Sequence, residues 1–88
     1  MNKSKISIEI FCAPNCNRCG RTVSLVQEVV EALNNELVDW RKVDIVEELD
    51  YAVELGIRAT PSIVINHQLI FTASPDKQTL KQTITDLL

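Results

Sequence analysis

Glycine, proline and basic residues are scarce in this sequence, and each shortage excludes a class of protein. Two Gly and three Pro among 88 residues are too few for a collagen-like or low-complexity disordered chain. No run of about 18 apolar residues occurs, so no membrane-spanning helix is predicted. Nine Lys plus Arg against twelve Asp plus Glu give a net charge of −3. This mixed, acidic balance excludes the basic footprint of a nucleic-acid-binding protein.

What the sequence does contain is enough for one folded domain. The chain has 88 residues, of which 45% are hydrophobic. A chain of this length can bury roughly 60–65% of its unfolded surface. We therefore predict a single domain over residues 1–88. The N-terminal segment has no apolar run of about 7–15 residues and no small-residue cleavage site, so no secretory signal is predicted. A cytoplasmic monomer without a membrane partner is expected.

The three cysteines all lie between Cys12 and Cys19. A disulfide framework that staples a small secreted fold needs cysteine pairs spread along the chain, and this clustering excludes it. In a reducing compartment, clustered thiols are more often catalytic or metal-bound than structural. The cysteines therefore point to chemistry or to a metal.

Apolar periodicity predicts seven elements in the order β-α-β-α-β-β-α. Strands are expected over 6–11, 37–45, 62–65 and 69–71, and helices over 18–33, over 46–55 and from residue 74 onward. The second helix is expected to bury Val46, Leu49 and Val53, and Gly56 suits its C-terminal cap. For the last helix we expect a Ser74 cap and a buried face of Leu80, Ile84, Leu87 and Leu88. The fold class is α/β, a four-stranded mixed sheet packed with three helices.

Cys16 and Cys19 form a Cys-x-x-Cys pair predicted at the first turn of the first helix. Residues three apart on a helix lie on one face, about 5–6 Å between Cβ atoms, which approaches the geometry of a disulfide. Free backbone N–H groups and the helix dipole stabilise a thiolate there, and thiol pKa values in such motifs fall to about 3.5–7.5. Cys16 is the predicted nucleophile and the deeper Cys19 the predicted resolving thiol.

A metal site is the competing interpretation of the same cysteines. A Cys-x-x-Cys pair supplies two of the four ligands of many zinc sites. The two further ligands would have to come from Cys12 and His67. His67 is expected in a polar hairpin turn, exposed to water. An iron–sulfur cluster held by the three cysteines also remains open, as does a simple structural role.

Residues 8–19 resemble the first strand and active-site loop of glutaredoxins and small thioredoxin-like proteins. Residues 56–65 are similar to the segment that carries this family's cis-proline, and Val43-Asp44 also fits the pattern. The resemblance implies a thioredoxin-like fold over nearly the whole chain and a thiol-disulfide oxidoreductase that needs no cofactor and no metal. It further implies that Pro61 is cis and that Thr60 and Pro61 contact the substrate.

The sequence departs from both parent patterns at several positions. Asn17-Arg18 replaces the dipeptide found between the cysteines of thioredoxins or glutaredoxins. Ile10 stands where thioredoxins have a buried Asp, and Glu9 is expected on the opposite face of the sheet. Of the glutathione-binding run of glutaredoxins, Asp76 alone could correspond. The proton relay to the resolving cysteine is therefore unassigned.

The sequence thus predicts an enzyme that reduces disulfides in proteins or small molecules and receives electrons from a separate reductase or a low-molecular-weight thiol. Two alternatives remain: a metal or iron–sulfur module that uses Cys12, Cys16 and Cys19, and a thioredoxin-like domain that only binds partners. Cys12 fits neither parent pattern. It could be a packed apolar residue, a regulatory third thiol, an alternative disulfide partner or a third metal ligand.

Overall fold

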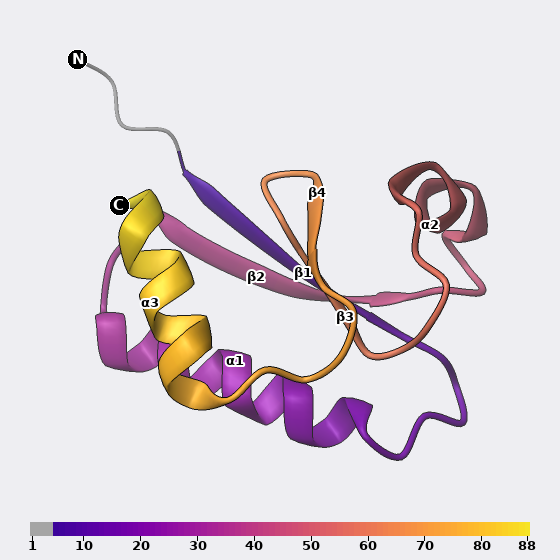
Figure 1. Ribbon diagram of the computed structural model, residues 1–88, viewed down its shortest axis with the longest axis horizontal. Coiled ribbons are helices and arrows are strands. Elements are labelled where there is room, and N and C mark those ends of the chain that lie inside the picture. Colours follow the sequence, from indigo (N-terminus) through magenta and orange to yellow (C-terminus); the bar gives the residue numbers. More distant parts are fainter. Residues whose placement is uncertain (1–4) are drawn as a thin grey trace.

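The computed structural model describes residues 5–88 and contains the seven elements in the predicted order (Figure 1). The elements are β1 (Ile6–Cys12), α1 (Cys19–Leu33), β2 (Val38–Asp44), α2 (Leu49–Leu55), β3 (Ser62–Ile65), β4 (Gln68–Phe71) and α3 (Lys77–Leu87). The predicted fold class, a four-stranded mixed sheet with three helices, is confirmed. The part of the N-terminal prediction that concerns residues 1–4 lies outside the described range. Within that range no helix is long and apolar enough to cross a membrane.

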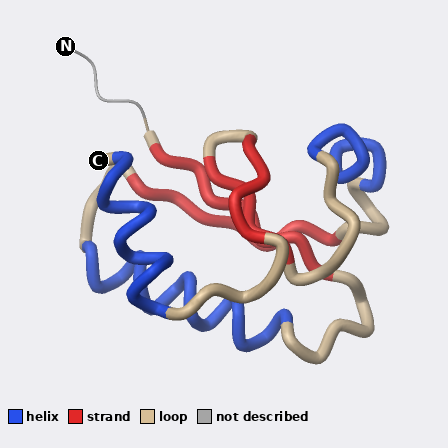
Figure 2. The backbone as a smooth tube through the Cα atoms, in the orientation of Figure 1, coloured by secondary structure: helices blue, strands red, loops and turns tan. Residues whose placement is uncertain are grey.

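The sheet has the strand order β2-β1-β3-β4, with β1 in the interior. β1 and β2 are parallel, whereas β1 with β3 and β3 with β4 are antiparallel. The parallel register places Ile10 beside Lys42 and Cys12 beside Asp44. Because parallel strands end at the same edge, the last residues of β1 and β2 are neighbours there. This edge is where the chain leaves β1 for the loop that carries Cys16 (Figure 2).

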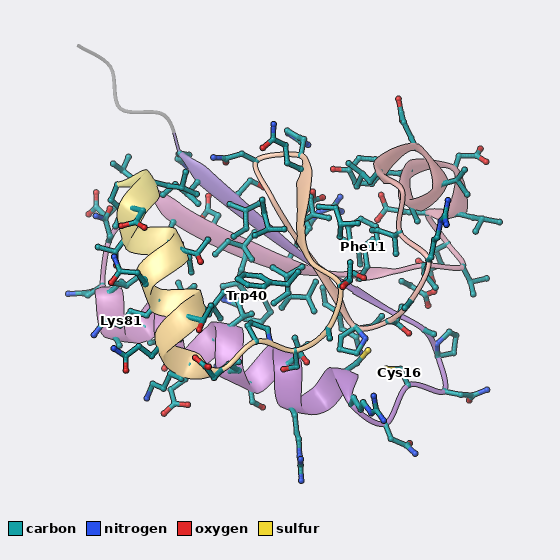
Figure 3. The ribbon with its side chains drawn as sticks, viewed as in Figure 1. Phe11, Cys16, Trp40 and Lys81 are labelled. Carbon is teal, nitrogen blue, oxygen red and sulfur yellow. The ribbon has the colours of Figure 1, made fainter. Side chains whose placement is uncertain are left out.

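Each face of the sheet has its own core. Ile8, Ile10 and Cys12 point toward α1 and α3, because alternate residues of a strand share a face. Phe11 belongs to a second cluster on the side of α2, and Figure 3 shows it on the opposite side of the sheet from Trp40. The first cluster also contains Val26, Val29, Ile63, Ile65, Leu80 and Ile84, and the second contains Val43, Ala52, Ile57 and Val64. The buried residues of α1 are Cys19, Thr22, Val26 and Val29.

The start of α3 differs from its prediction. Asp76, not Ser74, is the N-cap, and its Oδ1 accepts a 2.7 Å hydrogen bond from the backbone N–H of Thr79. The helix therefore begins after the Ser-Pro pair, where an extended Asp76 can satisfy the first free N–H groups. Leu80 and Ile84 are fully buried as expected. Leu87 and Leu88 are 49% and 43% exposed, since the helix ends beyond the edge of the core.

The prediction for α2 is wrong about which residues it buries. Val46, Leu49 and Val53 are 65%, 55% and 67% exposed. The helix begins three residues later than expected and rests on the sheet through Ala52 and the ring of Tyr51. Ala52 and Tyr51 face the sheet, and the larger apolar residues Val46, Leu49 and Val53 face outward. Gly56 caps the helix in the left-handed conformation, with φ 84°, as predicted.

A buried carboxylate lies between the sheet and α2. Glu9 is 2% exposed and accepts hydrogen bonds from Arg41 Nη2 at 2.6 Å and from Arg41 Nε at 3.0 Å. Its other oxygen accepts a 2.6 Å hydrogen bond from the Tyr51 hydroxyl. These partners satisfy the charge that burial would otherwise leave without compensation. As expected, Glu9 is on the face opposite the cysteines.

Candidate active site

Cys16 lies in the loop that links β1 to α1 and is half-buried. The prediction that the Cys-x-x-Cys pair occupies the first turn of α1 holds for Cys19, the first residue of the helix, and is wrong for Cys16, which precedes the helix. The loop instead folds into two tight turns, in which Cys16 N–H donates to the Ala13 carbonyl at 3.1 Å and Cys19 N–H to the Cys16 carbonyl at 3.4 Å. Cys16 thus precedes the helix but still lies at its positive end.

Hydrogen bonds converge on the Cys16 sulfur and favour its thiolate. The Cys19 thiol makes the largest contribution, followed by the Thr60 side chain and the backbone N–H groups of Arg18 and Cys19. Partial desolvation opposes them, and the net effect lowers the pKa of Cys16 to about 7. A substantial part of Cys16 is therefore ionised at neutral pH and accessible from the surface.

We expect the alkylation rate of Cys16 by iodoacetamide to rise with pH around a midpoint of about 7, the lowered pKa of this thiol. The rate rises because the thiolate is the nucleophile and forms as the pH passes through that pKa. Peptide mapping of label against pH measures the midpoint. Thr60→Val removes a hydrogen-bond donor to the Cys16 sulfur, and Cys19→Ser replaces a thiol donor by a hydroxyl on a shorter side chain. Both variants should therefore move the alkylation midpoint of Cys16 upward. A wild-type midpoint near that of an ordinary thiol, about 8.5, would contradict the assignment.

Cys19 is the first residue of α1 and is only 4% exposed. Burial is the largest cause that raises the pKa of its thiol, and contacts with the Cys12 and Cys16 thiols raise it further. Cys12, at the end of β1, is 2% exposed and packs in the same core. Cys19 therefore shares a core cluster with Cys12, with Cys16 packed against that cluster, and both of these thiols raise the pKa of Cys19.

A small pocket of about 130 Å³ borders all three cysteines, and we call it the thiol pocket. It is lined by Cys12, Ala13, Pro14, Cys16, Cys19, Gly20, Lys42 and Asp44. Sequence reasoning gave no role to Lys42 or Asp44. The register of the parallel β1–β2 pair, which the local sequence pattern does not specify, puts Cys12 beside Asp44 with both side chains on one face. The thiol pocket therefore combines three sulfurs with one acidic and one basic side chain.

Thr60 and Pro61 approach Cys16 from a segment far along the chain. The Thr60–Pro61 peptide bond is cis, Pro61 is buried, and the Thr60 side chain hydrogen-bonds to the Cys16 sulfur. Just after them, Ser62 Oγ donates to the Ala59 carbonyl at 2.6 Å and fixes the turn. A second, more open depression of about 370 Å³ lies above Cys16 and is lined by Ala13, Asn15, Cys16, Asn17, Arg18 and Thr60.

The donor set of a metal site is not assembled. Among residues 5–88, no three His, Cys, Asp or Glu side chains are arranged so that they could hold a metal ion. His67 is exposed in the β3–β4 turn, as predicted, and its Nδ1 lies 3.0 Å from the Tyr51 hydroxyl on the side of α2. The metal and iron–sulfur alternatives therefore have no geometric support in this structure.

Comparisons with known proteins agree with this fold. Residues 6–85 match a family model described as a thioredoxin domain. The chain is 35% identical over 81 residues to the thioredoxin of Methanocaldococcus jannaschii, and the alignment covers 92% of this chain and 94% of that protein. A thioredoxin structure from Malassezia sympodialis has a TM-score of 0.77 at 28% identity and covers 97% of this chain and 76% of that chain. A mutant thioredoxin of Halobacterium salinarum, at 20% identity, shares the fold with a TM-score of 0.79 over 96% of this chain and 75% of that chain.

Proposed function

The chain belongs to the thioredoxin family, and from that premise we propose that it is a thiol-disulfide oxidoreductase that reduces disulfides through Cys16 and Cys19. One observation carries the proposal, namely the asymmetry of the two thiols. Cys16 is accessible and its pKa is lowered to about 7, whereas the pKa of the buried Cys19 thiol is raised. A nucleophile and a resolving thiol need this difference, since the first must be ionised before the substrate arrives and the second must not.

In the proposed reaction, the Cys16 thiolate attacks one sulfur of the substrate disulfide. A mixed disulfide forms with Cys16, and the other substrate sulfur leaves as a thiolate and is protonated. Cys19 then loses its proton and attacks Cys16, which closes the Cys16–Cys19 disulfide and releases the second substrate thiol. The substrate gains two electrons and the protein loses two. A separate reductase or a low-molecular-weight thiol must then restore the dithiol.

The substrate would bind at the open depression above Cys16. Thr60 lines this depression, and Pro61 follows it in a cis peptide bond. The resemblance to the family implies that the backbone before the cis-proline pairs with an extended substrate segment. Since the depression is shallow and open, it suits a disulfide at the surface of a protein better than an enclosed small molecule. We therefore propose protein disulfides as the substrates. We further propose that the protein is a monomer and acts in the cytoplasm.

The proton of Cys19 needs an acceptor, and we propose Asp44. Glu9 is on the opposite face and is held by Arg41 and Tyr51. Among the described residues that line the thiol pocket, Asp44 supplies the carboxylate. Its Oδ1 accepts a 2.8 Å hydrogen bond from the Val46 N–H, which fixes the side chain in place. Asp44 would thus take over, from the neighbouring strand, the role that a β1 carboxylate has elsewhere in the family.

Replacing Asp44 with Asn should slow the resolving step by roughly tenfold to a hundredfold, at the low end of the range for general-base catalysis because water can substitute. Asn keeps the acceptor for the Val46 N–H but cannot take a proton. Rapid-quench mass spectrometry would follow decay of the mixed disulfide. Formation of the mixed disulfide should be unchanged, and equal slowing of both steps would argue for a structural role instead.

Trapping tests the roles of the two cysteines directly. The Cys19→Ser variant should accumulate mixed disulfides with a disulfide-containing protein such as insulin, linked through Cys16, because the resolving thiol is missing. Peptide mapping identifies the linked cysteine. The matched variant Cys12→Ser should reduce insulin and accumulate no adduct. Adducts through Cys12, or none at all together with ordinary reactivity at all three thiols, would favour a domain that only binds partners.

A further inference from the structure

We propose that the protein has a second disulfide site, Cys12–Cys19, which receives the disulfide from Cys16–Cys19 by internal exchange and leaves Cys16 as a free thiolate. The inference rests on the proposed function, because the Cys16–Cys19 disulfide is its starting point. It assigns a role to Cys12, the thiol that the reduction cycle does not use.

The surroundings that the three thiols share carry the proposal. Cys12 and Cys19 are buried in one core cluster, Cys16 packs against that cluster, and all three residues line the thiol pocket. Both of the other thiols also raise the pKa of the Cys19 thiol. The hydrogen bonds to the Cys16 sulfur come from Cys19, Thr60 and the backbone of residues 18 and 19. Cys19 is thus the shared partner, with one thiol on the strand side and one on the loop side. A disulfide to either neighbour is open to it, one at a time.

The surroundings of Cys12 and Cys19 suit a sulfur exchange. Both belong to the same core cluster, so the sheet and α1 hold their backbones in a fixed relation. The thiol pocket, about 130 Å³, adjoins all three sulfurs and leaves room for the Cys19 side chain to turn between its neighbours. Asp44 is paired with Cys12 across the β1–β2 register and lines the same pocket. A proton acceptor and a nearby cation, Lys42, are therefore beside the attacking group.

The exchange balances without an external oxidant. Cys12 loses its proton to Asp44 or to water, and its thiolate attacks the Cys19 sulfur of the Cys16–Cys19 disulfide. A Cys12–Cys19 bond forms, the Cys16–Cys19 bond breaks, and its electron pair leaves on Cys16. One disulfide is present before the step and one after it. Cys16 is the favoured leaving group, because its pKa of about 7 is low and leaving thiols of low pKa depart faster.

The two oxidised forms differ in what they present at the surface. With Cys16–Cys19 closed, the accessible sulfur is tied up and the protein has no exposed nucleophile at this site. With Cys12–Cys19 closed, the disulfide lies between residues that are 2% and 4% exposed, shielded from a reductase, while Cys16 is free. The oxidised protein could then still form a mixed disulfide by attack of the Cys16 thiolate on a partner disulfide, which releases the other partner sulfur as a thiolate.

A pair of two-cysteine variants tests the site. Cys16→Ser retains Cys12 and Cys19, and treatment with diamide should convert both thiols to an intramolecular disulfide, seen as a mass lower by two hydrogen atoms. The matched variant Cys19→Ser retains Cys12 and Cys16 and should form only intermolecular adducts through Cys16. Persistence of two free thiols in a folded Cys16→Ser protein would overturn the proposal, as would equal closure in Cys19→Ser. If Cys16→Ser does not fold, as judged by circular dichroism, Cys16→Ala serves the same purpose.

Alkylation of the oxidised protein tests the exchange itself. Oxidised wild type, freed of oxidant, should take up iodoacetamide at Cys16 in a measurable fraction of molecules, whereas oxidised Cys12→Ser should take up none. No label at Cys16 in the wild type would overturn the exchange. Insulin reduction separates this result from the proposed function. Activity in the Cys12→Ser variant without closure in Cys16→Ser defeats the second site alone, and closure without insulin reduction in the wild type defeats the proposed function alone.

Discussion

Replacing Cys16 with Ser is expected to lower the rate of insulin reduction by about 10³-fold or more. A serine hydroxyl is not ionised at neutral pH, and removal of a nucleophile that acts through a covalent intermediate commonly costs this much or more. The remaining thiols cannot compensate, because Cys12 and Cys19 are only 2% and 4% exposed and do not reach a protein substrate. The rate of insulin reduction at saturating reductant, with wild type measured in parallel, gives the ratio.

Cys12→Ser is the matched control for this loss. It removes a sulfur from the same cluster and should leave the steady-state rate within about twofold of wild type, since Cys12 takes no part in the reduction cycle. The proposed roles would be contradicted by a Cys16→Ser protein that retains a tenth of the activity or more. The proposed roles would also be contradicted if Cys12→Ser lost as much insulin-reducing activity as Cys16→Ser while its circular dichroism spectrum was unchanged.

The second large effect is expected on stability. Arg41→Met leaves Glu9 buried, with Tyr51 as its remaining partner, and should lower the free energy of unfolding by about 2–3 kcal/mol. The value lies below the full cost of breaking a buried ion pair, because Arg41 is 53% exposed and Tyr51 still donates to the carboxylate. Against a total stability of about 5–15 kcal/mol, this is a large fraction. Urea unfolding followed by the fluorescence of Trp40 measures the change.

Two further variants separate the buried pair from an ordinary surface one. Lys5→Met breaks a 3.6 Å ion pair with Asp39 whose side chains are 70% and 67% exposed, and should change stability by no more than about 0.5 kcal/mol. The double variant Glu9→Leu/Arg41→Met removes the buried charge itself and should recover most of the loss. If Arg41→Met proves no more costly than Lys5→Met, the carboxylate is not stabilised by this pair.

The order of the elements could be predicted because most segments have an apolar pattern typical of one kind of element and are buried as that pattern predicts. Ser62 to Ile65 is a short apolar run, and the structure buries all four residues between the two cores. The α2 prediction failed for a different reason. Helical periodicity identifies a stripe of large apolar residues. It does not say whether this stripe or a small residue on another side of the helix contacts the sheet. Here Ala52 makes that contact, and Val46 and Val53 face outward.

The structure brings together the candidate residues that the sequence singled out, but the contacts among them could not be predicted. The sequence placed Cys16 and Cys19 together by their spacing, and the family resemblance brought in Thr60 and Pro61. The sequence offered Cys12 as an alternative disulfide partner but did not identify Cys19 as its neighbour, because that proximity depends on where β1 ends relative to the start of α1. Asp44 was missed because its place depends on the register of two strands joined by a whole helix. Such long-range registers are not encoded in local periodicity.

The three thiols differ in how they withstand peroxide, because they lie at different depths of the fold. Cys12 ends β1 and is only 2% exposed, so its sulfur is shielded from peroxide in the folded protein. Cys16 needs no opening, and its thiolate is readily converted to a sulfenic acid. Cys19 can normally condense with that group to a disulfide and end the damage. When Cys19 is bonded to Cys12, no free Cys19 thiol can condense with the sulfenic acid of Cys16. Further peroxide then oxidises Cys16 irreversibly to a sulfinic acid.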